Sequence, residues 1–310
     1  MYKYRPELLN NFEMDSEMID LLKSFILIDN LNLLLVGNNG CGKTALLKCL
    51  VKEYYNGIED ETNILTINAL KDQGISYYRS DVKTFCQTMC SIPNKKKTIL
   101  LDDIDNINEQ SQQVFRNCID KYRDNVNFIA TCSNIQKVID SYQSRVTILK
   151  INILNIEQLE KIIEKISRKE NIQLTNEAKQ FILSISDNSV RTVINYMEKF
   201  KLFEEKITYD IAVKMCTNIS FIDFTKYTNY CIDKDLTNAV NLIYSIYDRG
   251  YSVMDIFDTY FLYIKTTTLL DENKKYEIIK LLCKYIAIFY NVHEDEIELA
   301  FFTKNLINII

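Results

Sequence analysis

The feature that most constrains this 310-residue chain is an octapeptide between an apolar run and a segment of helical periodicity. Residues 37–44 read GNNGCGKT, which fits the phosphate-binding pattern G-x-x-x-x-G-K-[ST]. The apolar run Leu33–Val36 predicts a strand before the loop, and the segment Ala45–Tyr55 predicts a helix after it. The alternative is a chance match in a glycine-containing loop, but a chance match does not require this strand and helix.

Loops of this kind point backbone N–H groups inward at the positive end of a helix, where they cradle phosphates. In such a loop Lys43 neutralises the outer phosphates of a nucleotide, and the Thr44 hydroxyl ligates Mg²⁺. The sequence therefore predicts a nucleotide site with a metal ion. Its expected contacts are Gly37, Asn38, Asn39, Gly40, Cys41, Gly42, Lys43, Thr44 and Ala45.

A second motif carries the acids that hydrolysis requires in addition to phosphate binding. The run Thr98–Leu101 predicts a strand that ends in Asp102 and Asp103. At the carboxyl end of a parallel strand, Asp102 can reach the Mg²⁺ shell and Asp103 can orient or polarise the attacking water. The alternative is that both acids cap the helix that follows. We expect Asp102 to be a metal ligand and Asp103 to act on water.

Further polar residues fall where phosphate chemistry can use them. Ser133 or Asn134, after the predicted strand Asn127–Thr131, can sense the γ-phosphate, although a plain turn uses the same residues. Arg145, at the start of another strand, can reach a neighbour's nucleotide site as an arginine finger, or form a surface salt bridge. Arg191 lies in the first turn of a predicted helix, where a cation opposes the helix dipole, so we expect it to have an anionic partner.

The order of elements indicates an α/β fold followed by helical modules. Strands alternate with helices up to about residue 153, which predicts a parallel sheet covered by helices on both faces. The expected strands are Leu33–Val36, Ile64–Asn68, Thr98–Asp102, Asn127–Thr131 and Val146–Ile151.

Beyond about residue 154 the pattern is helical. One expected stripe consists of Leu159, Ile162, Ile163 and Ile166, and another of Leu236, Val240, Ile243 and Tyr247. The segment Ile278–Tyr290 is nearly continuously apolar, so we expect it to be buried on several sides, in a domain core or against neighbouring subunits.

Composition excludes several classes of protein. No apolar run reaches the roughly 20 residues of a membrane span, and nothing resembles a signal peptide, so we expect a soluble intracellular protein. The nine cysteines form no C-x-x-C pair and His293 is the single histidine, which argues against a zinc site or a disulfide framework. A net charge of −5 excludes a uniformly basic nucleic-acid binder but leaves room for a local basic stripe.

Six segments together carry a resemblance to a known family. They are KYRPELLNNF from Lys3, LLLVGNNGCGKTALLKCLVKEYY, LTINALKDQGISYYRSDVKTF, ILLDDIDNINEQSQQVFRNCIDKY, CSNIQKVIDSYQSRV and DNSVRTVINYM. In order and spacing they resemble the small subunits of replication factor C, the clamp loader of eukaryotes and archaea, over about the first 200 residues. The remainder is similar only in length and helical character. Abundant Asn, Ile, Lys and Tyr suggest an AT-rich genome, such as that of a large DNA virus or a protist.

The resemblance implies an architecture and partners. Residues 1–153 would form an AAA+ nucleotide-binding domain, residues 154–217 a helical lid, and residues 218–310 a helical collar through which subunits assemble. Five such subunits, small and large, form an arc that uses ATP with Mg²⁺ to open a PCNA-like sliding clamp. The arc sets this clamp on primer–template DNA, independently of base sequence. Such a protein acts in the nucleus or in a viral replication factory.

The resemblance also implies roles for residues. Arg191 would be the lid's sensor arginine, and Arg145 would act on the ATP of the adjacent subunit. The segment Tyr4, Arg5 and Pro6 would pack near adenine. Positions that would contact the DNA backbone, or belong to the helix coupling DNA to the ATP site, are Arg79, Lys83, Gln112, Arg116 and Lys137. The alternative for the basic residues is a solvated helix face.

Departures from the family leave other functions open. Asp103 stands where the family usually has Glu, so water activation is expected to be weakened or rearranged. Glu13–Asp15 replaces the usual V-G-Q near the adenine pocket, the loop reads GNNGCGKT instead of GPPGTGKT, and Val146 replaces a cysteine. The leading hypothesis is an ATP-hydrolysing clamp-loader subunit. The alternatives are a structural subunit that binds ATP but hydrolyses it weakly, and another AAA+ replication loader, such as a helicase loader.

The resemblance places a candidate clamp-contact surface at Phe85–Lys97. Within it we expect Met89 and Ile92 to be the apolar anchors.

Overall fold

The computed structural model describes residues 2–58, 62–68, 74–186, 188–203, 205–216, 219, 221–289 and 292–310. The chain divides into two compact units. The first comprises Met1–Glu170 with Asn188–Glu198, and the second comprises Asn171–Asp187 with Lys199–Ile310. The boundary expected between residues 217 and 218 lies outside the described residues. The division into nucleotide-binding, lid and collar domains stays a prediction.

A five-stranded parallel sheet forms the centre of the first unit, in the order β2-β3-β4-β1-β5. The strands are β1 (Leu33–Val36), β2 (Ile64–Asn68), β3 (Lys97–Asp102), β4 (Val126–Cys132) and β5 (Thr147–Lys150). All five were expected within two residues of these bounds, and the predicted α/β fold class is confirmed. In this order β1 lies between β4 and β5, so the loop that follows it lies between the carboxyl ends of those two strands. That edge is where parallel α/β sheets bind ligands.

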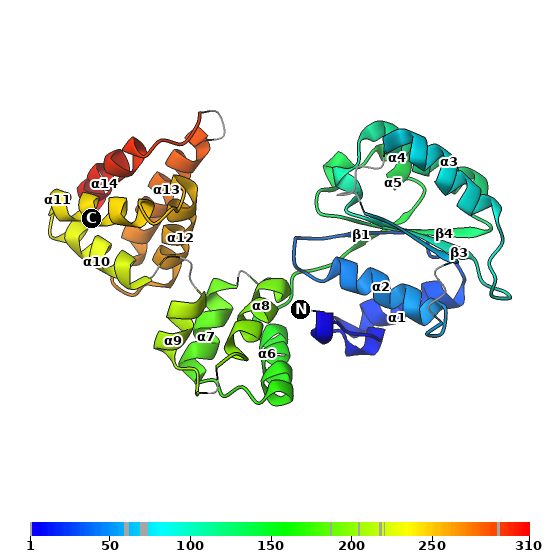
Figure 1. The fold of residues 1–310 in the computed structure, drawn as a ribbon, viewed down its shortest axis with the longest axis horizontal. Helices are drawn as coiled ribbons and strands as arrows, with labels where there is room; N and C mark the ends of the chain where they lie inside the picture. Colours follow the sequence, from blue (N-terminus) through cyan, green and yellow to red (C-terminus); the bar gives the residue numbers. More distant parts are fainter. Residues whose placement is uncertain are drawn as a thin grey trace. The chain divides into compact units, whose positions relative to one another are not determined.

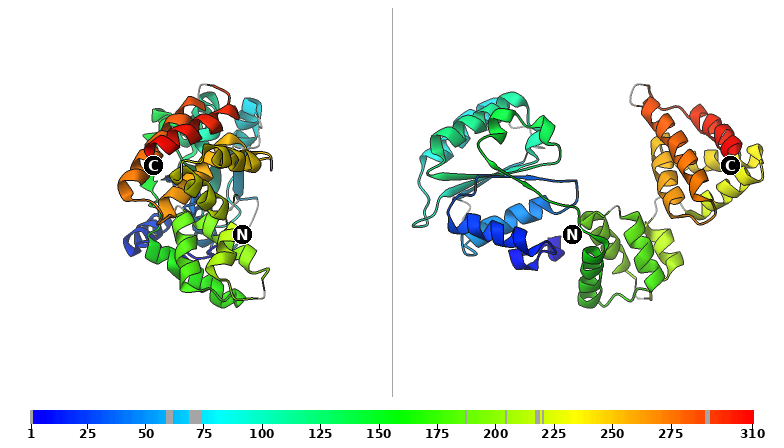
Figure 2. Two further views of the ribbon diagram at one scale, coloured as in Figure 1. Left: turned by 90° about the vertical axis from the view of Figure 1, so that its left-hand side faces the viewer. Right: turned by 180° about the vertical axis from the view of Figure 1, so that it is seen from behind.

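Helices cover both faces of the sheet, as Figures 1 and 2 show. One face carries α1 (Ser16–Leu27) and α2 (Lys43–Tyr54), and the other carries α3 (Gly74–Gln87), α4 (Glu109–Tyr122) and α5 (Asp140–Gln143). The short 3₁₀ helices are η1 (Tyr2–Tyr4), η2 (Leu9–Asn11), η3 (Ile104–Asn106) and η4 (Ile135–Lys137).

Side chains of one strand alternate between the two cores of this sheet. Leu34 belongs to the core beneath α3 and α4, whereas Leu33 and Leu35 belong to the core beneath α1 and α2. All three are 0% exposed. Burial on both faces explains why β1 reads as an uninterrupted apolar run instead of an alternating pattern.

Two helices extend the first unit beyond the sheet, α6 (Ile156–Glu170) and part of α8 (Val190–Phe200). On α6 the predicted stripe is buried at Leu159, Ile163 and Ile166. Its fourth member, Ile162, is half-buried and lines the cavity described below. This helix therefore uses one apolar face for packing and for the cavity wall.

The second unit is built from helices with an aromatic core. They are α7 (Asn176–Ile185), α9 (Tyr209–Cys216), α10 (Phe221–Ile232), α11 (Leu236–Tyr247), α12 (Val253–Thr266), α13 (Glu272–Phe289) and α14 (Ile297–Ile309). Phe224, Tyr227 and Tyr260 are at most 1% exposed, and their rings pack 5.2–5.4 Å from centroid to centroid. Aromatic edge-to-face packing thus joins α10 to α12.

The residues that are buried on α11 and α13 can be compared with the apolar patterns predicted for these helices. On α11 the buried residues are Ala239, Ile243 and Ile246, whereas Leu236 is 42% exposed. Of the predicted stripe only Ile243 is fully buried, so the buried face is rotated about the helix axis from the predicted one. The predicted stripe included Leu236 at the first turn, which lies at the edge of the packed face. On α13 one face is buried within the described residues, while Ile288 is 42% exposed and Tyr290 lies outside them. Burial of the remaining surface against neighbouring subunits stays a prediction.

None of the helices in the described part of the chain is both long and apolar enough to cross a membrane.

Candidate active site

In the loop between β1 and α2, a side chain at Gly40 or at Gly37 would collide with a neighbouring segment. Gly40 has a φ of 80°, and a Cβ atom there would lie 2.3 Å from Oγ of Ser189. A Cβ atom at Gly37 would lie 2.7 Å from the carbonyl oxygen of Ile151. Side chains at either position would push neighbouring segments away, so the loop keeps its backbone N–H groups close to any bound phosphate.

Lys43 is folded back over this loop. Its side chain is 5% exposed, and Nζ donates to the carbonyl oxygens of Gly37 (2.7 Å) and Asn38 (2.9 Å). A third contact, of 3.3 Å, joins Nζ to Oγ of Ser133. Because these partners are neutral, the ammonium charge is hydrogen-bonded but not neutralised, which favours an anionic ligand beside it.

The Asp102 carboxylate is fixed by two hydroxyl groups. Thr44 Oγ1 donates to Asp102 Oδ1 across 3.0 Å, and Thr131 Oγ1 donates to the same oxygen across 2.8 Å. The Thr131 hydroxyl also accepts the backbone N–H of Asp103 at 2.9 Å. The expected metal-ligating pair, Thr44 and Asp102, is therefore brought together at one point.

Asp103 has a backbone conformation that few residues adopt easily. Its φ and ψ are 57° and 56°, in the left-handed region, and its side chain makes no capping hydrogen bond to η3. The following helix α4 is capped instead by Asn108, whose side chain accepts from the N–H of Ser111 at 2.8 Å. Neither Asp102 nor Asp103 therefore caps α4 through its side chain, which argues against the helix-capping alternative.

The surroundings of Asp103 alter its ionisation. Burial raises the pKa of this carboxyl above its ordinary value, and the neighbouring Asp102 charge raises it further. Lys43 and Arg191 act in the opposite direction on the same pKa. A carboxyl group that holds its proton more tightly than usual, close to the phosphate loop, is more basic than an ordinary Asp side chain.

Asp105 holds the loop that follows β4, a role that sequence reasoning missed. Its Oδ2 accepts the backbone N–H groups of Ser133 (3.1 Å) and Asn134 (3.0 Å). Ser133 Oγ in turn donates to Oδ1 of Asn39, at 2.6 Å. The predicted phosphate sensors are thereby linked to the phosphate loop.

The other residue missed from sequence is Thr131. Its signal was a hydroxyl near the carboxyl end of a strand, after the apolar run Phe128–Ala130, and that of Asp105 was an acid two positions after Asp103.

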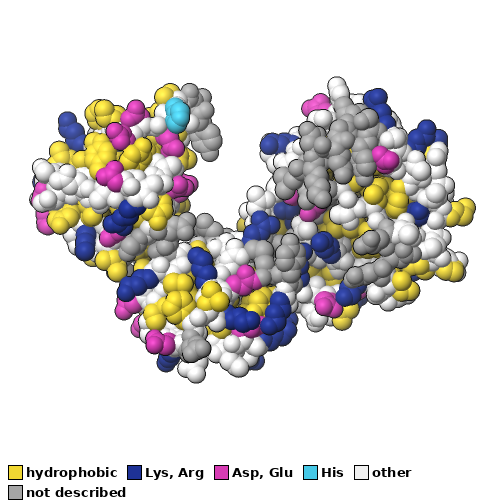
Figure 3. Space-filling view, viewed as in Figure 1, with side chains coloured by type: hydrophobic (Ala, Val, Ile, Leu, Met, Phe, Trp, Pro, Cys, Tyr) yellow, Lys and Arg dark blue, Asp and Glu magenta, His cyan; other side chains and the backbone are white. Residues whose placement is uncertain are grey.

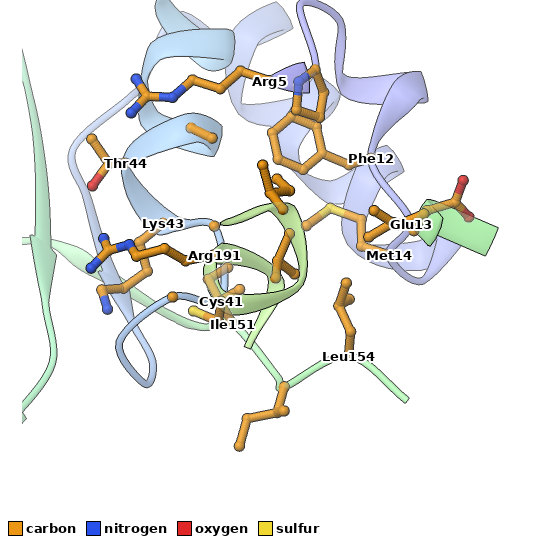
Figure 4. A pocket seen from close by; sticks show the side chains of 18 of the residues that line it. Arg5, Phe12, Glu13, Met14, Cys41, Lys43, Thr44, Ile151, Leu154 and Arg191 are labelled. Carbon is orange, nitrogen blue, oxygen red and sulfur yellow. The ribbon is translucent and has the colours of Figure 1, made fainter. Parts of the chain in front are cut away.

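A cavity of about 1090 Å³ lies beside these groups, large enough for a nucleotide (Figure 4). Its polar end contains Lys43, Thr44, Asp103, Ser133, Asn134 and Arg191, with Asn39, Gly40, Cys41, Gly42 and Ala45 of the loop. Gly37, Asn38 and Asp102 are not among the residues lining it. Its other end is mainly apolar, with Phe12, Met14, Met18, Ile151, Ile153, Leu154, Ile162, Ile166 and Ile194. Tyr4, Arg5 and Pro6 also line the cavity, as do charged residues that include Lys165 and Lys169, and Figure 4 shows Arg191 and Lys43 extending toward the same side.

Arg145 lies outside this cavity and is held by an acid of α4. Its Nε donates to Oδ1 of Asp120 across 2.6 Å, and Nη1 donates to the carbonyl oxygen of Ser141 across 2.6 Å. The hydrogen bond from Arg145 lowers the pKa of Asp120, and Arg116, whose Nε lies 3.4 Å from Oδ2, contributes too. Within one chain the salt bridge is thus present, and Arg145 does not reach the chain's own cavity.

The residues expected to contact DNA do not lie on one element. Arg79 and Lys83 are exposed one turn apart on α3, and Arg116 is half-buried on α4. Lys137, in η4, is exposed and lines the cavity. Gln112 is completely buried, and its amide donates to Ile104, Ile107 and Lys137 carbonyls at 3.2, 2.9 and 3.0 Å.

The expected clamp-contact segment presents only one of its two apolar anchors. Met89 is 84% exposed, whereas Ile92 is half-buried and packs against the core beneath α1 and α2. The expectation that Ile92 is an outward anchor does not agree with this packing, because its side chain already has partners within the chain.

Two family models match the chain in separate regions. Residues 33–154 match the ATPase family associated with various cellular activities (AAA), and residues 222–285 match the replication factor C C-terminal domain. The first model covers the sheet, the phosphate loop and the acidic motif at Asp102 and Asp103. The second covers α10 to α13 in the second unit, where the sequence itself gave only a helical pattern.

Similar proteins include replication factor C small subunits. That of Acanthamoeba polyphaga mimivirus is 29% identical, over 90% of this chain and 87% of the relative. That of the archaeon Methanococcus maripaludis is 30% identical, over 82% of this chain and 81% of the relative. Replication factor C subunit 4 of Saccharomyces cerevisiae is 27% identical, over 90% of this chain and 86% of the relative.

Solved structures agree on the fold. The RuvB Holliday junction branch migration motor of Thermotoga maritima has a TM-score of 0.56 at 15% identity, covering 84% of this chain and 90% of that one. Domain III of the DnaA replication initiation protein from the same organism has a TM-score of 0.52 at 18% identity, covering 67% and 95%. Likeness at this identity concerns architecture alone. Taken with the 30% identity to a relative that is covered over 81% of its length, the two matched models mean that this chain belongs to the replication factor C small-subunit family of AAA+ ATPases.

Proposed function

We propose that this chain binds ATP with Mg²⁺ and hydrolyses it as a small subunit of a pentameric clamp loader. The assembly would open a PCNA-like sliding clamp and place it on primer–template DNA, in the nucleus or in a viral replication factory. The observation that carries the proposal is the Thr44–Asp102–Thr131 hydrogen-bond cluster beside Lys43, at the end of the phosphate loop. Family membership supports the assembly and its task.

The residues present fit a magnesium ion. Thr44 offers a hydroxyl oxygen and Asp102 a carboxylate oxygen, and hard oxygen ligands of this kind suit Mg²⁺, which is held by one or two protein groups together with phosphates. When bound, Mg²⁺ supplies positive charge that neutralises the phosphate oxygens. Thr131 keeps the Asp102 carboxylate oriented toward Thr44.

The chain's own side chains suggest how phosphate is engaged. Lys43 exchanges the carbonyl oxygens of Gly37 and Asn38 for the outer phosphates of ATP, since a charged acceptor binds an ammonium group more strongly than a neutral one. Asp103 orients the attacking water and takes its proton. Ser133, held in place through Asp105, meets the terminal phosphate.

Contacts to other molecules would use groups outside the cavity. Arg145 would act in trans on the ATP of an adjacent subunit, as an arginine finger does. Arg79, Lys83, Arg116 and Lys137 would neutralise DNA phosphates without reading bases, which makes binding sensitive to salt. The helices from residue 218 onward would join neighbouring subunits, and Met89 would contact the clamp.

A second candidate function is that of a structural subunit that binds ATP but hydrolyses it slowly. Asp103 favours it, because its side chain is one methylene shorter than the Glu usual in the family and its backbone is held in the left-handed region. In that case ATP stabilises the assembly and Arg145 serves a neighbour, while water activation belongs to other subunits.

Steady-state ATP hydrolysis by the reconstituted complex, with clamp and primer–template DNA, tests the proposal. We expect Asp103→Ala to lower this subunit's turnover by about 100-fold or more, as the loss of a general base does. Asp124→Ala removes an exposed acid after α4 and is the matched control.

Each result has a separate meaning. Equal rates for wild type and Asp103→Ala, with Lys43→Ala still disrupting assembly, would favour the structural subunit. A complex that binds no sliding clamp would point instead to a different AAA+ loader.

A further inference from the structure

The side chain of Glu170, the last residue of α6, is enclosed by the N-terminal segment. It is only 6% exposed, and its Oε1 accepts a hydrogen bond from Lys3 Nζ. The Tyr4 hydroxyl hydrogen-bonds the same carboxylate. Burial, and after it this contact, raises the pKa of Tyr4 to about 12. An enclosed carboxylate is costly unless it is paired, so Glu170 and the N-terminal segment depend on one another.

The same N-terminal segment is fastened at its other end to α2. The backbone N–H of Leu9 donates to Oε1 of Glu53 across 2.6 Å, and Lys52 pairs with Glu7 at 3.0 Å. Leu9 itself is 0% exposed. We call residues Lys3–Leu9 the strap, because they join the end of α6 to the helix that begins with the phosphate loop.

The strap and α6 form walls of one cavity. Tyr4, Arg5 and Pro6 of the strap line it, and Ile162 and Ile166 of α6 line it as well. Figure 4 shows the Arg5 side chain extending toward the side of Thr44, whereas Phe12 lies with Met14 and Glu13, and Figure 3 shows Lys and Arg side chains gathered over the α6 region. The hydrogen bonds of Lys43 run to Gly37, Asn38 and Ser133, and the Thr44 hydroxyl donates to Asp102, so the phosphate end of the cavity has its own supports outside the strap.

We propose that Glu170 is a positioning residue that clasps the strap to α6 and thereby sets the affinity of the site for the base and ribose of a nucleotide. The inference rests on the proposed nucleotide site and identifies what closes its apolar end. With Glu170 ionised, Lys3 and Tyr4 are held before any ligand enters. Without the clasp, nucleotide binding has to order the strap, and that entropic cost weakens binding.

The test compares two ligands that differ only in whether they carry a nucleoside. Isothermal titration measures the Kd of ATP and of inorganic tripolyphosphate, each with Mg²⁺, for the full chain. We expect Glu170→Gln to weaken ATP about tenfold, since a charge-assisted contact is lost. Tripolyphosphate, held by the loop and Lys43, should keep its Kd within about twofold, because Lys43 and Thr44 are held by hydrogen bonds to the loop and to Asp102 that the Glu170 substitution leaves in place.

Two further variants keep the outcome interpretable. Glu157→Gln removes an exposed acid from the first turn of the same helix and should change neither Kd. Tyr4→Phe removes only one hydroxyl and should move the Kd of ATP in the same direction as Glu170→Gln, by a smaller factor.

Three outcomes would overturn the inference. ATP affinity unchanged in Glu170→Gln would mean that the clasp has no effect on the site. Equal weakening of ATP and tripolyphosphate would mean a general disturbance of the fold. If the wild-type chain binds neither ligand, the proposed nucleotide site itself is wrong. This outcome is separate from the other two because it is measured on the wild-type chain and not on a variant.

Discussion

At the scale of single residues, Asp103 combines a short side chain with a left-handed backbone. Asp and Asn tolerate that region better than longer side chains, because their polar groups can hydrogen-bond locally. The φ of 57° at Asp103 therefore offers a physical reason for Asp at a position where the family usually has Glu. The same position combines burial with a neighbouring acid, so conformation and ionisation are both unusual at one residue.

The raised pKa of Asp103 predicts how stability changes with pH. Folding strengthens proton binding here, so the stabilisation associated with Asp103 is present below its unfolded pKa and is lost as pH rises through its folded pKa. Asp103→Asn keeps the backbone and removes the charge. We expect the variant to melt at a higher temperature than wild type at neutral pH, with the difference disappearing below the ordinary Asp pKa of about 3.9.

Thermal unfolding of the ligand-free chain across that pH range measures the effect. Asp124→Asn, at an exposed acid, should show no such trend. A gap between Asp103→Asn and wild type that widens on acidification would contradict the assignment.

At the scale of elements, α4 supports both the segment that follows Asp103 and the segment that follows Asn134. Gln112 donates from α4 to the carbonyl oxygens of Ile104 in η3 and Lys137 in η4, and its Oε1 accepts the N–H of Ile139 at 2.9 Å. Arg116 lies one turn further along α4. A contact that shifts α4 would therefore move the acidic motif, Asp102 and Asp103, together with the loop that contains Ser133 and Asn134.

Loss of this buried amide should be costly. Gln112→Ala leaves several backbone groups without their partner, and we expect the free energy of unfolding to fall by at least about 2 kcal/mol. Gln113→Ala, at the exposed neighbour, should stay within about 0.5 kcal/mol of wild type. Urea unfolding followed by circular dichroism compares the two. Equal midpoints for both variants would show that the amide does not support the edge.

At the scale of the whole molecule, one chain contains a nucleotide cavity and an arginine that does not enter it. Arg145 is anchored by Asp120 and Ser141, so its guanidinium is held in place before any partner arrives. Under the proposed role of Arg145 in trans, a complete hydrolytic site needs two chains, one for the phosphate loop and one for the arginine.

Removing that arginine should separate binding from turnover. For the isolated chain, Arg145→Ala should leave the Kd of ATP within about twofold, because the residue is absent from the cavity lining. In the assembled complex, the neighbouring site should lose about 10³-fold in kcat, as arginine fingers contribute. Arg123→Ala, at a nearby exposed arginine, is the control. Weakened ATP binding by the isolated chain would contradict a role in trans.

Sequence patterns over a few neighbouring residues predicted much of the fold and part of the candidate site. The β1 strand, the phosphate loop and Asp102 could be predicted because each depends on neighbours a few residues away. The face of α11 was misjudged since Leu236, at its first turn, lies at the edge of the packed surface.

By itself, the sequence determined the alternation of strands and helices, the phosphate loop with its acidic strand, and the family. Only the tertiary structure decided that Thr131 orients Asp102, that Asp105 holds the sensor loop and that Glu170 clasps the strap. The physical reason is distance along the chain. A pattern of apolar and polar residues reports which face of an element is buried. A single hydrogen bond between residues 167 positions apart, as between Lys3 and Glu170, exists only once packing has brought them together.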